Sequence, residues 1–271
     1  MPHLARRRGE SGYYHVVPKG IADQIIFEDD INRRYYLKLL RQAMLDTGIR
    51  VLAYCLMSNH VHLVVEDADD RLSEALKYIH ERYAMMFANK IERTGGIFRK
   101  PYWRETIESD EHLLCAVRYV HANPAAAGIC RASTYEWSSV KDYLGRNGLT
   151  DTSMVLNMLG GRDGFIQFSA SANATALPFP GSKLRNHLTD DEAAQIARDI
   201  LGRDGVNLAK ATKSKRKSAI ATLRQRGFTR KQVSRICGVG DSAVKHYFEH
   251  SEAPVQNLPK RDTPFLEDLS H

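Results

Sequence analysis

The chain has 271 residues, of which 43% are hydrophobic and 26% charged, and its 39 basic and 32 acidic side chains give a formal net charge of +7. This composition is typical of a folded globular protein and argues against wholesale disorder. No stretch approaches the roughly 20 apolar residues that a membrane span needs. No apolar segment follows the basic start of the chain, so we expect a cytoplasmic protein with no membrane partner.

The positive charge is concentrated in the last third of the chain. Residues 203–249 contain twelve basic and three acidic side chains, a local charge of +9, and the rest of the chain sums to −2. Before this segment, residues 168–182 are rich in small and turn-forming residues and have no periodic apolar pattern. We therefore predict four parts: a first domain at 1–150, a linker region at 151–183, a basic helical DNA-binding domain at 184–250 and an irregular tail at 251–271.

The first part predicts strands and helices in alternation. The expected elements, in chain order, are a strand at 12–17, a helix from Asp29 or Asp30 to Thr47, a hairpin of strands 51–57 and 60–65, a helix at 72–92, a strand at 99–107 and a helix from Ser109 to Asn123, ended by Pro124. Ser58 and Asn59 form the short hairpin turn. This order predicts an α+β fold, a ferredoxin-like antiparallel sheet with helices packed on one face.

A pair of histidines stands out in the second hairpin strand. Side chains alternate along a strand, so His60 and His62 lie on one face while apolar residues line the other. Two neutral imidazoles suit a divalent cation, and a third ligand of oxygen type favours Mg²⁺ or Mn²⁺ over zinc. The alternative is a chance His-x-His pair without a metal. The four cysteines contain no C-x-x-C pair that would indicate a zinc or redox site.

The helix ending at Pro124 supplies a second group of candidates. Tyr119 and Asn123 are four residues apart and share one helix face. Asn123 can provide the oxygen ligand beside Tyr119 as a nucleophile. A tyrosine at this spacing is also compatible with a core aromatic residue.

Three segments together resemble a known family. They are Leu56-Met57-Ser58-Asn59-His60-Val61-His62-Leu63-Val64-Val65, Tyr119-Val120-His121-Ala122-Asn123-Pro124, and Glu136-Trp137-Ser138-Ser139. In this order they are similar to the single-tyrosine HUH transposases, and most of all to the REP-associated tyrosine transposase branch, over roughly residues 1–145.

The resemblance implies a nuclease domain that cuts and rejoins single-stranded DNA next to a hairpin through a 5′-phosphotyrosine intermediate. It implies Tyr119 as the catalytic residue and His60, His62 and Asn123 as ligands of Mg²⁺ or Mn²⁺. The basic part after the linker is a departure from the compact family form.

Further residues suit a DNA partner. Around the site, basic side chains can contact the phosphate backbone and aromatic ones can stack on unpaired bases; the candidates are Arg6, Arg7, Arg8, Lys19, Arg99, Lys100, Arg104, Trp103 and Tyr102. Each charged residue is alternatively a solvated surface group. The expected partner is single-stranded or hairpin DNA, and a homodimer is left open.

The basic domain predicts four helices, at about 190–201, 215–225, 230–237 and 241–248. The last two, joined by Gly238-Val239-Gly240, resemble a helix-turn-helix, which would direct Ser242 and Lys245 toward the major groove. The alternative is a small helical bundle with a solvated basic face. For the whole protein, a zinc hydrolase and a non-enzymatic DNA-binding regulator are the rival functions.

Overall fold

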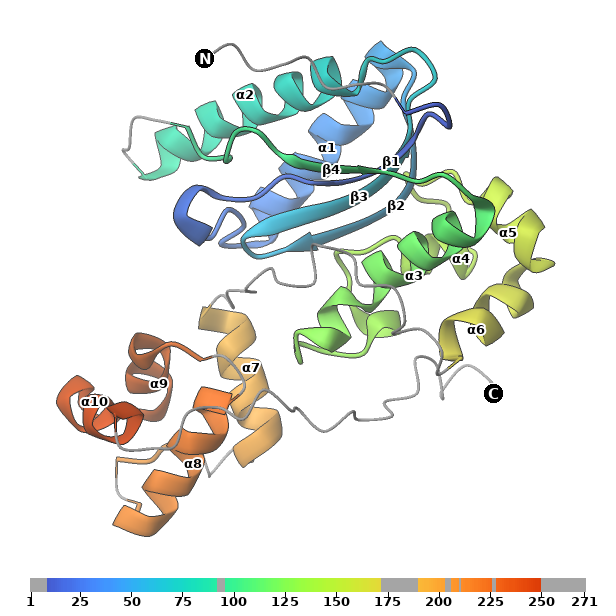
Figure 1. Ribbon diagram of the computed structural model, residues 1–271. Coiled ribbons are helices and arrows are strands. Elements are labelled where there is room, and N and C mark those ends of the chain that lie inside the picture. Colours follow the sequence, from blue (N-terminus) through green and yellow to red (C-terminus); the bar gives the residue numbers. More distant parts are fainter. Residues whose placement is uncertain are drawn as a thin grey trace. The chain divides into compact units, whose positions relative to one another are not determined.

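The computed structural model describes residues 9–91, 96–171, 190–202, 206–209, 211–225 and 228–249 (Figure 1). The described residues group into two compact units, one taking in most residues up to Ser171 and the other those from Asp190 onward. The proposed basic arm of Arg6, Arg7 and Arg8 and the expected tail at 251–271 lie outside the described residues. No helix in the described ranges is both long and apolar enough to span a membrane.

The first unit has the predicted alternation of strands and helices. Its elements are β1 (Tyr13–Val17), the 3-10 helix η1 (Ile21–Asp23), α1 (Asp30–Thr47), β2 (Arg50–Met57), β3 (His60–Glu66), α2 (Leu72–Ile91), β4 (Trp103–Thr106) and α3 (Asp110–Ala126). The strands form one antiparallel sheet in the order β2-β3-β1-β4. The predicted α+β fold is therefore confirmed.

Helices cover both faces of this sheet, whereas the sequence predicted one covered face. On one face Val61, Leu63 and Val65 of β3 pack in a core cluster with residues of α1 and α2. On the other face α3 contacts β2 and β3, and Figure 1 shows α3 on the side of the sheet away from α1 and α2. The face that carries the histidines is therefore covered by α3.

Local signals set both ends of α1 but not the end of α3. The Asp29 side chain accepts a hydrogen bond from the Asn32 backbone N–H (2.9 Å), and Gly48 ends α1 in the left-handed region at φ 74°. Pro124 lies inside α3 instead of ending it. A proline so near the helix end removes one backbone hydrogen bond, and the helix closes two residues later.

Strand β4 is shorter than the predicted strand at 99–107 because the first residues pair elsewhere. Phe98 forms an isolated bridge with Gly20, and the Arg99 N–H donates to the Lys19 carbonyl (2.7 Å). Pro101 has no N–H to donate to a ladder. Continuous pairing with β1 therefore begins only at Trp103.

The expected linker at 151–183 is wrong in its first part. Its residues up to Ala170 form two helices, α5 (Ser153–Leu159) and α6 (Arg162–Ala170). Two short helices, η2 (Ala132–Thr134) and α4 (Val140–Tyr143), precede them. Val155 and Phe165 are buried, and the Phe165 ring stacks on Tyr143 with centroids 4.6 Å apart. Each helix is too short to show a clear apolar period. Residues 172–189 lie outside the described residues.

The second unit contains α7 (Asp190–Leu201), α8 (Lys213–Gln225), α9 (Arg230–Cys237) and α10 (Asp241–Glu249). Thr229 and Gln232 form a capping box at the start of α9, and Gly238 ends it at φ 63°. Val233, Cys237 and Val244 belong to a separate buried cluster. The four predicted helices are present, with α8 starting two residues earlier than expected.

Candidate active site

The two histidines of β3 converge on one point. Both side chains are fully buried, and their Nε2 atoms lie 3.0 Å apart. The rings stand nearly perpendicular, at 80°. The alternation predicted for this strand is therefore present, with both imidazoles on the face opposite α1 and α2.

Each imidazole also has a polar neighbour at Nδ1, the ring nitrogen that faces away from the other histidine of the pair. The Nδ1 of His60 lies 2.7 Å from Asn59 Oδ1. The Asn59 amide nitrogen donates to the Asp23 carbonyl at 3.5 Å, which orients the amide oxygen toward His60. The Nδ1 of His62 lies 3.1 Å from Nε2 of His15. Metal-binding histidines characteristically have such partners at the nitrogen that does not bind the ion.

The donor set fits a small divalent cation. Two ligands at about 2.1 Å from an octahedral ion are about 3.0 Å apart when they sit at right angles, which matches the spacing of the two Nε2 atoms. Tetrahedral zinc with similar bond lengths would hold them about 3.4 Å apart. Within the described ranges there is no metal-binding cluster of three or more His, Cys, Asp or Glu side chains.

Helix α3 brings Tyr119 and Asn123 to the same place. The Tyr119 ring meets His62 edge-on with centroids 5.5 Å apart, and meets His15 at 5.7 Å. The Asn123 amide nitrogen donates to the Tyr119 carbonyl (2.9 Å), and the same side chain hydrogen-bonds His62. The four residues predicted from the sequence as nucleophile and ligands therefore lie together.

Burial controls the charge of these groups. Desolvation lowers the pKa of His62 to about 3, opposed by its hydrogen bond with Asn123, and burial also lowers the pKa of His15. His62 is thus uncharged near neutral pH, as a metal ligand must be. Its neighbour His15 is uncharged as well. Burial raises the pKa of Tyr119, so its phenolate forms only if a nearby positive charge stabilises it.

The other side of α3 is anchored to the sheet through the segment Tyr135–Ser139. This segment pairs along the edge of β2, because the Leu56 N–H donates to the Trp137 carbonyl (2.8 Å) and the Ser139 N–H to the Tyr54 carbonyl (3.0 Å). His121 of α3 is fully buried, and its Nε2 lies 2.7 Å from Ser139 Oγ. The third segment of the family resemblance therefore holds the tyrosine-bearing helix in place.

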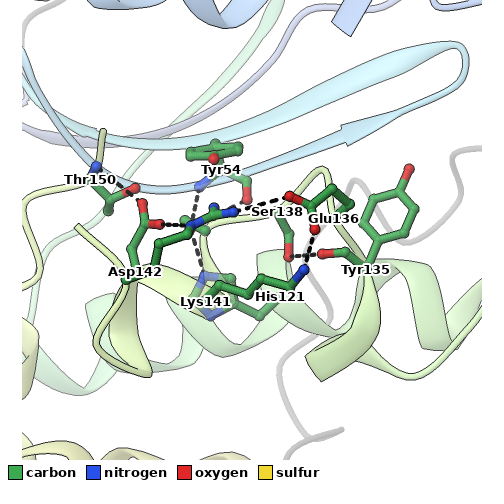
Figure 2. A network of polar contacts seen from close by, with 10 residues as sticks. Tyr54, His121, Tyr135, Glu136, Ser138, Lys141, Asp142 and Thr150 are labelled. Carbon is green, nitrogen blue, oxygen red and sulfur yellow. Dashed lines mark hydrogen bonds and ion pairs between the residues drawn. The ribbon is translucent and has the colours of Figure 1, made fainter. Parts of the chain in front are cut away.

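A polar network fixes this segment in turn (Figure 2). Glu136 forms ion pairs with Lys141 and with Arg146, the latter at 3.2 Å. Arg146 also pairs with the buried Asp142 at 3.0 Å, and Asp142 accepts a hydrogen bond from the Thr150 N–H. The network joins the residues on either side of α4 to one another.

Helix α6 contacts α3 directly. The Arg118 guanidinium donates to the Phe168 carbonyl (3.2 Å) and to Ser171 Oγ (3.1 Å), and lies over the Phe168 ring at 4.3 Å. The Phe165 ring meets His121 at 5.8 Å. The segment expected to be a linker therefore packs against the helix that carries Tyr119.

The predicted DNA-contacting residues of the first unit are only partly brought to the site. Trp103 is on the histidine face and meets His15 edge-on at 5.1 Å. Arg104 is on the opposite face, with its guanidinium 4.7 Å from the Tyr14 ring. Tyr102 likewise packs with the α1 and α2 core, so placing it and Arg104 beside the site was wrong.

The remaining candidates have varied surroundings. The backbone of Lys19 forms an isolated antiparallel bridge with that of His60, and its side chain forms an ion pair with Asp23 at 2.5 Å. Arg99 and Lys100 are exposed. In the second unit, Ser242 and Lys245 are both exposed on α10.

Sequence reasoning missed His15 and assigned no role to Asn59. His15 stands opposite Val64 in the register of β1 with β3, and Val64 shares a face with His62. Pairing the predicted strand at 12–17 with the histidine strand would have exposed this signal. Asn59 was treated only as a turn residue.

The fold and the site together define an α+β domain in which a buried His-x-His pair faces a tyrosine on a covering helix. Residues 10–123 match the family model described as transposase IS200-like. The front domain is therefore similar in sequence to the IS200-like transposases. A solved REP-associated tyrosine transposase, bound to a REP hairpin, is similar at 15% identity and a TM-score of 0.47, over 56% of this chain and 90% of that chain. No curated protein matches the chain.

Proposed function

We propose that the protein is a metal-dependent enzyme that cleaves and rejoins single-stranded DNA near hairpins, with Tyr119 as the nucleophile. The observation that carries the proposal is the convergence of the two Nε2 atoms, 3.0 Å apart, with the Tyr119 ring edge-on to His62 at 5.5 Å between centroids. The match of residues 10–123 to a transposase family model supports the substrate class. His60, His62 and Asn123 would hold Mg²⁺ or Mn²⁺, and the ion would polarise the scissile phosphate and offset its growing charge.

In the proposed reaction the Tyr119 oxygen attacks the phosphorus and loses its proton to solvent. The bond between phosphorus and the 3′ oxygen breaks, and that oxygen leaves as a 3′-hydroxyl after taking up a proton. The product is a 5′-phosphotyrosine ester. Because this ester keeps the phosphodiester bond energy, attack by a 3′-hydroxyl reseals the strand without another energy source.

The test is adduct formation on single-stranded DNA that contains a hairpin, with and without Mg²⁺ or Mn²⁺, read on a denaturing gel. Wild-type protein should form a metal-dependent adduct, and Tyr119→Phe should bind the DNA without forming one. If the wild-type protein binds a broad pool of oligonucleotides but forms no adduct, the strand-transfer proposal fails and the DNA-binding regulator is the better account. Activity that requires zinc would favour a zinc hydrolase.

We further propose that Tyr119 acts at the metal site of its own chain, so that no homodimer is needed for cleavage. The support is that Tyr119 contacts His62 within one chain and that its helix is bonded to β2 through His121 and Ser139. Mixing Tyr119→Phe with His62→Ala protein should then give no adduct. An adduct in the mixture would mean that two chains share one site.

For the second unit we propose helix-turn-helix DNA binding through α10. Val244 is buried while Ser242 and Lys245 on the same helix are exposed, which leaves a polar face available for a DNA groove. Lys245→Ala should weaken DNA binding and reduce the salt slope by about one unit if the lysine contacts a phosphate. Lys38→Ala, an exposed lysine of α1, is the control. An unchanged slope in Lys245→Ala would contradict this placement.

A further inference from the structure

His15 lies in the middle of the sheet, packed between aromatic rings of the candidate site. It is fully buried, and its ring stacks on His62 with centroids 5.3 Å apart and an interplanar angle of 23°. The rings of Trp103 and Tyr119 meet it edge-on at 5.1 and 5.7 Å. These contacts from β3, β4 and α3 fix the plane of the imidazole, so the direction of its nitrogens is set by packing.

The contact between His15 Nε2 and His62 Nδ1, 3.1 Å long, contains one hydrogen. An uncharged imidazole carries a single N–H, on one nitrogen or the other. If His62 donates from Nδ1, its Nε2 keeps a lone pair directed toward His60. If His15 donates instead, His62 must carry its hydrogen on Nε2, where it points at His60 and blocks metal coordination.

We infer that His15 is a positioning residue of the metal site: it accepts the Nδ1 hydrogen of His62 and so makes the Nε2 of His62 a ligand. The inference rests on the proposed function in taking His62 as a ligand. His60 has a simpler partner, because the amide oxygen of Asn59 can only accept. The two ligands are therefore oriented by different acceptors, and only the partner of His62 can itself switch between donor and acceptor.

Mn²⁺ binding without DNA tests the consequence for affinity. Loss of an outer partner of a metal-binding histidine weakens metal affinity by about 10- to 100-fold, so His15→Phe should raise the Mn²⁺ dissociation constant by that factor. His15→Gln, whose amide oxygen can accept the same hydrogen, should recover part of the loss. His80→Phe removes another buried histidine, on α2, and should bind Mn²⁺ as the wild type does. Wild-type affinity in folded His15→Phe would overturn the inference.

The tautomer of His62 can be read directly from ¹⁵N shifts of the imidazoles in protein titrated with Mg²⁺, because without an ion the 3.0 Å contact between the two Nε2 atoms needs a hydrogen of its own. We expect the wild type to shift to the Nδ1–H form of His62 as Mg²⁺ is added, and His15→Phe to keep a larger share of the Nε2–H form at the same Mg²⁺ concentration. A wild-type His62 that keeps its hydrogen on Nε2 at saturating Mg²⁺ would overturn the inference even if the variants failed to fold. Neither measurement involves DNA, so absence of a DNA adduct would refute the proposed function and leave the role of His15 to be decided by these results.

Discussion

Phe165 of α6 offers a direct test of how the region after residue 150 supports the site. Its side chain is 1% exposed, stacks on Tyr143 at 4.6 Å and meets His121 of α3 edge-on at 5.8 Å. Truncating a buried phenylalanine to alanine costs about 3–5 kcal/mol, of which the two ring contacts account for part. Phe165→Ala should lower the free energy of unfolding of the first unit by that amount.

Denaturation by urea, followed by tryptophan fluorescence, measures this effect in the first unit alone. The two tryptophans of the chain are Trp103 and Trp137, and both belong to that unit. Gln167→Ala, at an exposed position of α6, is the matched control and should change the free energy by no more than about 0.5 kcal/mol. A loss below about 1 kcal/mol in Phe165→Ala would refute the placement of α6 in the core of the unit.

Two further predictions concern stability. Burial, reinforced by the charge of Lys100, lowers the pKa of His80 to about 3. The unfolded chain takes up this proton near pH 6.5. The contribution of the neutral His80 to the free energy of unfolding should therefore be fully present above pH 6.5 and fall by about 1 kcal/mol per pH unit as the pH drops toward 3. His80→Phe should flatten this decline in urea titrations between pH 6.5 and 4.5, and an unchanged slope would argue against a neutral buried His80. In the second unit, Thr229→Ala removes the side chain that accepts from the Gln232 N–H and should cost about 1 kcal/mol in native-state hydrogen exchange of α9. Thr229→Ser keeps the acceptor and should retain most of the protection; equal losses in both variants would contradict the capping role.

The alternation of side chains along strands made part of the site predictable, and it also explains why the assignment of Arg104 to the site was wrong. The period of two placed His60 and His62 on one face without any tertiary information. The same rule puts Trp103 and Arg104 on opposite faces of β4, although both had been assigned to the site. His15 was missed because its proximity to His62 depends on the register between β1 and β3, which no local pattern specifies.

Other features depend on tertiary contacts that are weak in the sequence. Pro124 has a strong local preference for ending a helix, yet α3 continues to Ala126 since only one backbone bond is lost so close to the end. Helices α5 and α6 have seven and nine residues. Helices of this length are marginal alone and derive their stability from packing, here through Val155 and Phe165.

The central claim is that Tyr119 becomes covalently linked to DNA. After reaction with a hairpin-containing single strand and Mn²⁺, digestion with trypsin should release residues 119–131, in which Tyr119 is the one tyrosine. Mass spectrometry should find this peptide carrying a nucleotide through its 5′ phosphate, in the wild type and not in Tyr119→Phe. A nucleotide on any other residue, or an adduct that persists in Tyr119→Phe, would contradict the account.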